Sequence, residues 1–334
     1  MMITIHHAIL HILDFHSGLT VFSEHELDCG SSSVFTFLSK HLEKLQKAVN
    51  GKSGSFYDDS PLKARLTAYT AGETEFVAFS ADLAERTYAA LAQSEDPQPL
   101  DVLVVDFTTD DIRMLALLLC DNKVGFTHQV VQEDSRVRNE IINHYAILPQ
   151  PSQKIDEYAL IQLDSLAILF NEKKRLVNGQ EAFALSDQVL SCDAALSVKE
   201  TLAAVRSVAE EIAENHGKST LETVAKVKSR LAETAEISET LDLAALGREL
   251  FPASPLLQQE YAAELKNCGL PETVTLDRDF AVKSSRSHKI KTDTGIEVTF
   301  PADYFQNTEF IEFINNPNGT ISIQLKNIGK IINK

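Results

Sequence analysis

Apolar and polar residues follow a different spacing in each half of the chain. In the first half, β-branched and aliphatic residues form strand-like runs at positions 3–13, 19–22, 100–107, 114–119, 158–163 and 165–170. Apolar residues recur at helical spacing over 34–49 and 74–92. Asp110 and Asp111 separate two of the runs, which predicts neighbouring antiparallel strands in the middle of a sheet. We therefore expect an α+β domain over residues 1–191, with a mainly antiparallel sheet and helices.

The second half is helical before it returns to strands. Helical spacing covers 198–213, 220–231, 241–250 and 258–265. Ser219 and Glu222 are placed for an N-terminal capping box, and Gly269 for a C-cap. Short strand-like runs follow at 274–276, 296–300 and 320–323, the last of them after the hairpin signal Asn318–Gly319. This predicts a C-terminal domain over 192–334, with a helical half followed by a small terminal β-sheet.

Composition indicates a cytoplasmic chain. No run approaches the roughly 20 apolar residues that span a bilayer, and the first residues lack the basic segment of a signal peptide. The four cysteines are scattered without metal-ligand spacing, as is typical of free thiols in a reducing compartment. We expect no membrane partner.

Motifs that carry chemistry are absent from the sequence. It contains no phosphate-binding loop, GxGxxG fingerprint, GxSxG elbow or HExxH helix. His7 and His11 share one face of a predicted strand, but no Cys, Asp or Glu stands nearby at ligand spacing, which favours a structural role. Asp106, Asp110 and Asp111 follow an apolar strand, where either catalytic carboxylates or a plain acidic turn is found. We expect no catalytic centre, no metal and no cofactor.

The net charge of −17 limits any contact with nucleic acid, because a uniformly acidic surface is repelled by phosphates. Residues 273–334 nevertheless carry eight Lys or Arg against seven Asp or Glu, a balance of +1. Within them lies an acid-free basic stretch whose cations are Lys283, Arg286, Lys289 and Lys291. These cations are candidate phosphate contacts. The alternative is a solvated face whose positive charges balance the acidic residues of the rest of the chain.

A smaller basic patch is formed by Lys173, Lys174 and Arg175. Neither it nor the basic stretch is interleaved with aromatic residues that would be exposed. Stacking on the bases of a single strand therefore has little support.

Three segments resemble the bacterial family of thirty-seven-kilodalton nucleoid-associated proteins. They are residues 8–13 (AILHIL), 72–80 (GETEFVAFS) and 300–305 (FPADYF), in the family's order and at matching chain length. The resemblance implies association with the nucleoid, non-specific binding of nucleic acid and no known catalysis. It supplies no binding residues.

The implied partners are double-stranded DNA, with RNA as the alternative nucleic acid, or other nucleoid proteins. A homodimer would double a confined basic surface. Two further functions stay open at this point. One is an acidic DNA mimic or adaptor that acts on DNA-binding enzymes, and the other is a metal-dependent nuclease.

Overall fold

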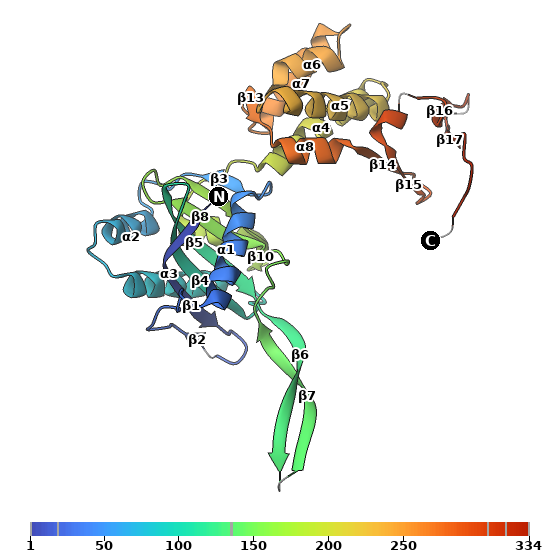
Figure 1. Cartoon of the computed structure of the whole chain (residues 1–334). Coiled ribbons are helices and arrows are strands. Elements are labelled where there is room, and N and C mark those ends of the chain that lie inside the picture. The colour runs from blue at the N-terminus through green and yellow to red at the C-terminus, as the bar shows by residue number, and fades with distance from the viewer. Residues whose placement is uncertain (1, 19, 134–135, 306, 318, 333–334) are drawn as a thin grey trace. The chain divides into compact units, whose positions relative to one another are not determined.

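The computed structural model describes residues 2–18, 20–133, 136–305, 307–317 and 319–332. Its contacts divide the chain into two compact units, Met1–Ser197 and Val198–Lys334 (Figure 1). Residues 192–197 belong to the first unit. The amides of Asp193 and Ala195 donate hydrogen bonds to the carbonyl oxygens of Ser55 and Ser53, beside and within the short strand β3 (Lys52–Gly54). That each unit folds on its own stays a prediction.

The first unit is built on a seven-stranded sheet with the order β2-β1-β4-β5-β8-β9-β3. All of its neighbouring strands are antiparallel, as expected from the sequence. In chain order its strands are β1 (Ile3–Leu13), β2 (Thr20–Val21), β3 (Lys52–Gly54), β4 (Leu100–Thr109), β5 (Ile112–Asp121), β8 (Glu157–Gln162) and β9 (Ile168–Asn171).

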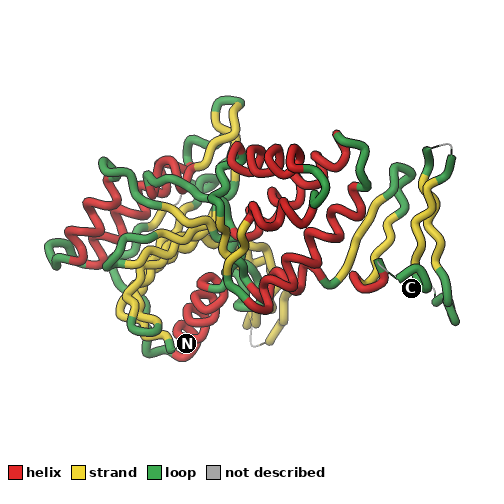
Figure 2. The backbone as a smooth tube through the Cα atoms, turned by 90° about the horizontal axis from the view of Figure 1, so that it is seen from above, coloured by secondary structure: helices red, strands yellow, loops and turns green. Residues whose placement is uncertain are grey.

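Both faces of this sheet are buried, because helices cover each side (Figure 2). Helix α1 (Ser32–Gln46) packs on one face together with Leu103 and Val105 of β4. Helices α2 (Pro61–Thr70) and α3 (Phe76–Leu91) and the π-helical segment η1 (Leu185–Leu190) pack on the other face with Val102 and Val104. Successive residues of a strand point to opposite faces, so double coverage requires an unbroken apolar run. This explains why the predicted strands consist of continuous apolar runs in the sequence.

Two hairpins of the first unit lie outside this sheet. They are β6 (Lys123–Glu133) with β7 (Arg136–Ile147), and β10 (Lys174–Val177) with β11 (Gln180–Phe183). The apolar pattern predicted neither of them, and it also missed helix α2. The β6–β7 hairpin extends away from the rest of its unit as a long two-stranded ribbon (Figure 1).

The second unit has a helical core with small hairpins, which confirms the α+β class of the chain. Its helices are α4 (Val198–Asn215), α5 (Thr220–Ile237), α6 (Leu243–Leu250), α7 (Pro255–Asn267) and α8 (Arg278–Ser285). Its hairpins pair β12 (Thr240–Asp242) with β13 (Thr273–Thr275), β14 (Ser287–Lys291) with β15 (Glu297–Pro301), and β16 (Ile311–Asn315) with β17 (Ile321–Leu325). A single-turn 3₁₀ helix, η2 (Ala302–Tyr304), follows β15. Among the residues described, no helix is long and apolar enough to cross a membrane.

The predicted helix ends of the second unit are largely confirmed. The Ser219 hydroxyl accepts a hydrogen bond from the amide of Glu222 at the start of α5. Gly269 follows α7 with a φ of +76°, a conformation that favours glycine. Asn318, the first residue of the predicted turn Asn318–Gly319, lies outside the described residues.

The buried carboxyl group of Asp101 should make the first unit less stable as pH rises. Asp101 is 5% exposed on β4, and burial raises its pKa from 3.8 to about 6. Between these two values the unfolded chain ionises while the folded chain does not, so folding stability is lost as pH rises and the loss is complete above the folded pKa. Above the folded pKa, the ionisation of Asp101 should cost about 3 kcal/mol of folding stability. Asp101→Asn cannot ionise, so the variant should not show this loss.

Urea denaturation of wild type and Asp101→Asn at about pH 4 and about pH 7.5 measures this difference, since those values lie on either side of the transition. The variant should gain stability over wild type only at the higher pH. An equal difference between the two proteins at both pH values would contradict the prediction.

Candidate nucleic-acid interface

The basic stretch begins in the last turn of α8. The Asp277 side chain caps this helix by accepting a hydrogen bond of 2.7 Å from the amide of Phe280. Ala281 and Ser285 are buried on the inner side of the helix. Lys283 and Arg286 are therefore left exposed at its C-terminal end, where the helix dipole favours positive charge.

Strand β14 carries the other two cations on its outer face. Its alternation buries His288, whose ring lies 5.5 Å from that of Phe300 and 5.2 Å from that of Phe305. Lys289 and Lys291 then point outward, since neighbouring residues of a strand face opposite sides. The rings of His288 and Phe300 are thus directed inward and offer no platform for stacking bases.

The four cations differ in the charges that surround them. Lys289 Nζ lies 2.8 Å from Glu297 Oε2 on strand β15. Lys283, Arg286 and Lys291 have no ion-pair partner in the part of the chain that the structure describes. Glu297 lies outside the acid-free stretch, so the sequence did not predict its contact with Lys289. The register of β14 and β15 brings Glu297 opposite the lysines.

Two further cations adjoin the stretch. Lys228 of α5 is half-buried, and its Nζ donates to the carbonyl oxygen of Ser287 at 3.0 Å. Burial lowers the pKa of Lys228, and the positive charge of Arg206 on α4 lowers it further. The pKa of His288 is lowered first by burial and then by Lys228. Sequence reasoning missed Lys228 and Arg206 because they precede the stretch by more than fifty residues and stand on different helices.

A pocket of about 320 Å³ lies beside Arg286, between α5, α8 and η2. Its walls include the carboxylates of Glu233, Glu236 and Asp303. Three carboxylates against one guanidinium give a negative local charge, which disfavours a phosphate inside the pocket. Phosphate contact would therefore use the exposed cations outside it.

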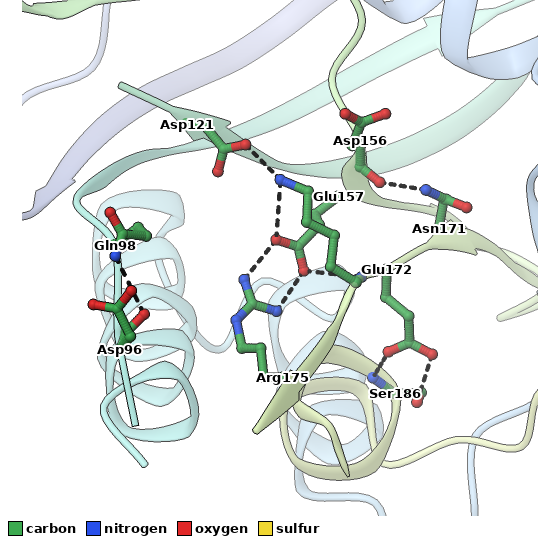
Figure 3. Close-up of polar contacts among 10 residues, drawn as sticks. Asp96, Gln98, Asp121, Asp156, Glu157, Asn171, Glu172, Arg175 and Ser186 are labelled. Carbon is green, nitrogen blue, oxygen red and sulfur yellow. Dashed lines mark hydrogen bonds and ion pairs between the residues drawn. The ribbon is translucent and has the colours of Figure 1, made fainter. Parts of the chain in front are cut away.

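The smaller basic patch at Lys173–Arg175 is neutralised by acids (Figure 3). Arg175 makes a bidentate pair with Glu157 at 2.6 and 2.5 Å, and Glu157 is only 1% exposed. Lys173 Nζ lies 2.5 Å from Asp121, and Lys174 pairs with Glu181 on β11. Lys173 and Arg175 therefore tie the β10–β11 hairpin to the sheet, and Lys174 ties its two strands together.

The aspartates at the end of β4 do not form a joint site. Asp106 is fully buried, and Arg113 donates to its carboxylate at 3.1 and 2.6 Å. The Tyr69 hydroxyl donates to the same carboxylate at 2.5 Å, and burial followed by this bond raises the pKa of Tyr69. Asp110 and Asp111 are exposed and have positive φ angles, which is the geometry of a tight hairpin turn.

The paired histidines also have separate surroundings. His7 contacts Glu26 at 3.0 Å and stacks on Phe76, whereas His11 is buried and accepts from the amide of Ser23. Burial lowers the pKa of His11 to about 4. Within the described chain, no three His, Cys, Asp or Glu side chains gather as a metal site, and all four cysteines are free.

The Glu157–Arg175 pair should contribute strongly to stability. Removing one partner of a buried pair leaves an uncompensated charge, so we expect Arg175→Ala to lower the free energy of unfolding by about 3–5 kcal/mol. Lys174→Ala breaks an exposed pair and should cost less than about 1 kcal/mol. Urea denaturation of both variants provides the comparison, and equal losses would contradict it.

Comparison with known sequences places this fold in a family. No curated protein matches the chain. A family model does match it, over residues 9–333, and this model is described as NA37, nucleoid-associated protein YejK. The match includes both units and the whole basic stretch. The chain therefore belongs to the NA37 family of nucleoid-associated proteins.

Proposed function

We propose that this nucleoid-associated protein binds double-stranded DNA directly and without sequence preference through its basic stretch. The observation that carries the proposal is the exposure of Lys283, Arg286 and Lys291 without an acidic partner among the described residues. Cations of this kind contact phosphates, which position a protein on the duplex without reading its bases. Membership of the NA37 family supports a role at the nucleoid.

Acidic residues far from the basic stretch do not weaken its contact with DNA. Exposed charges are screened beyond about 8 Å at physiological ionic strength. A phosphate at the basic stretch therefore responds mainly to the charges close to it, which are the cations of the stretch and Lys228 beside Ser287 on one side, and Glu297 and the carboxylates of the neighbouring pocket on the other. A homodimer would present two such stretches and double the number of phosphate contacts.

One hydroxyl group of the stretch supports the same function. Ser287 is exposed between the cations and can donate a hydrogen bond to a phosphate oxygen, whereas the Ser284 hydroxyl donates to the carbonyl oxygen of Ala281 at 3.0 Å. The buried positions of His288 and Phe300 favour a duplex over a single strand, because neither of these two rings is available for base stacking.

Replacing all four cations by glutamine should weaken binding to every duplex alike. Each lost phosphate contact lowers the slope of log K against log salt by about 0.9, so three contacts lower it by about 3. Lys289→Gln alone should have the smallest effect of the single changes, because Glu297 already offsets that charge. Fluorescence anisotropy with two unrelated duplexes over a salt series gives both affinity and slope.

The matched control replaces three lysines and one arginine elsewhere on the second unit. Lys199, Lys218, Arg248 and Lys266 are exposed, and changing them to glutamine removes the same net charge. The control should keep most of the wild-type slope. If the control and the test variant lose affinity equally, overall charge governs binding. If neither changes, DNA contact does not use this stretch, and an adaptor role gains support.

We also propose that the protein has no catalytic activity toward nucleic acids. The buried position of Asp106 beside Arg113 supports this, since a carboxylate held in an ion pair is unsuited to bind a metal or activate water. Duplex DNA and RNA incubated with the protein and Mg²⁺ or Mn²⁺ should stay intact. Cleavage that disappears in Asp106→Asn or Asp110→Asn would contradict the proposal.

A further inference from the structure

The β6–β7 ribbon, residues 123–133 with 136–147, has no layer packed against it. Its two strands form a sheet of their own and pair only with each other among the described residues. At about 3.4 Å per residue, the ten or so paired positions extend roughly 35 Å. A two-stranded hairpin without a covering layer is marginally stable in water. The ribbon is therefore a structure whose surface favours a partner.

The two faces of the ribbon differ in charge. Residues paired across the strands share a face, and one face consists of the pairs Phe126–Asn143, His128–Ile141, Val130–Asn139 and Gln132–Val137. This uncharged face contains no Lys, Arg, Asp or Glu. The opposite face carries Arg136 and the ion pair Arg138–Glu140 at 2.6 Å.

The apolar side chains of the uncharged face are open to solvent. The exposed fractions are 78% for Phe126, 60% for Val130, 67% for Val137 and 81% for Ile141. Four large apolar residues in one row, bordered by amides, are typical of an interaction surface rather than of scattered exposure. Their concentration on a single face of the ribbon is the second indication of a partner.

The charges of this face and of the chain limit which partner can bind there. DNA would require cations, and the uncharged face has none. Two copies of this chain, at −17 each, repel wherever their bodies approach. A ribbon that extends from its own unit can meet the ribbon of a second copy along roughly 35 Å, which keeps the two first units at opposite ends of the contact, well beyond the screening length of about 8 Å.

We propose that the uncharged face of the β6–β7 ribbon is the interface of a homodimer, in which two ribbons pack face to face and antiparallel about a two-fold axis. Such an interface uses the same residues on both copies. Phe126 near the base of one ribbon then lies opposite Val137 near the tip of the other. The inference does not depend on DNA binding.

The size of the face sets the strength expected of this dimer. A face about 35 Å long and about 10 Å wide buries a few hundred Å² per copy, less than the roughly 800 Å² of a standard interface. We therefore expect a reversible dimer that dissociates in the micromolar range. Sedimentation velocity without DNA, over about 1 to 100 µM, should show monomer giving way to dimer.

Paired charges on the uncharged face should abolish the dimer. Phe126→Lys with Ile141→Lys places four like charges in the interface and should raise the dissociation constant by more than about 100-fold. The control Thr127→Lys with Gln129→Lys adds the same charge to the opposite face and should leave dimerisation within a few-fold of wild type. Circular dichroism melting should be unchanged in both variants, since neither pair touches a core.

Cross-linking tests the same contact without adding charge. In a background with Cys29→Ser and Cys268→Ser, which removes the two thiols that are not buried, Val130→Cys lies near the middle of the uncharged face, and a short bismaleimide should link two copies. Gln129→Cys, on the opposite face, should link far less. A wild type that stays monomeric at every concentration would overturn the proposal and assign the face to a different partner. A dimer that survives the two lysines, or equal cross-linking at both positions, would also overturn it.

Discussion

Charge compensation decides which cations of this acidic chain can reach a partner. The chain carries 31 basic and 48 acidic residues, so the acids around each lysine or arginine decide whether its charge is free to act. Lys173, Lys174 and Arg175 are not free in this sense, since Asp121, Glu181 and Glu157 neutralise them. The stretch from Lys283 to Lys291 differs because Lys283, Arg286 and Lys291 form no ion pair among the described residues, although Glu297 lies opposite Lys291 and carboxylates line the pocket beside Arg286.

Elements with strong local periodicity were predictable from the sequence. The strands β1, β4 and β5 lie between two helical layers, so their residues must be apolar on both faces, and that signal is unmistakable in one dimension. The β6–β7 ribbon was not predictable, because it has no buried face to impose alternation. Helix α2 does pack on the sheet, and it was missed although Ser60 and Pro61 form a typical helix start.

The candidate site was predictable in part. A count of charges located Lys283, Arg286, Lys289 and Lys291, because an acid-free run is visible without a structure. The same count could not show that Glu297 offsets Lys289 or that Lys228 reaches Ser287, since both contacts depend on register and helix packing. Sequence spacing likewise left open whether Asp106 and Asp110 belong to a catalytic site or to an acidic turn. In the structure Asp106 is buried and paired with Arg113, whereas Asp110 lies exposed in the turn.

A weak dimer and a weak DNA contact would strengthen each other. Three phosphate contacts give only modest affinity at physiological salt, because non-specific binding is largely counterion release. Two copies joined through their ribbons turn the second contact into an intramolecular one, which raises overall affinity without any new contact. Linkage is reciprocal, so DNA that gathers two copies favours the dimer by the same factor. An acidic protein with a confined basic surface could in this way bind where copies are concentrated on DNA and dissociate when they are dilute.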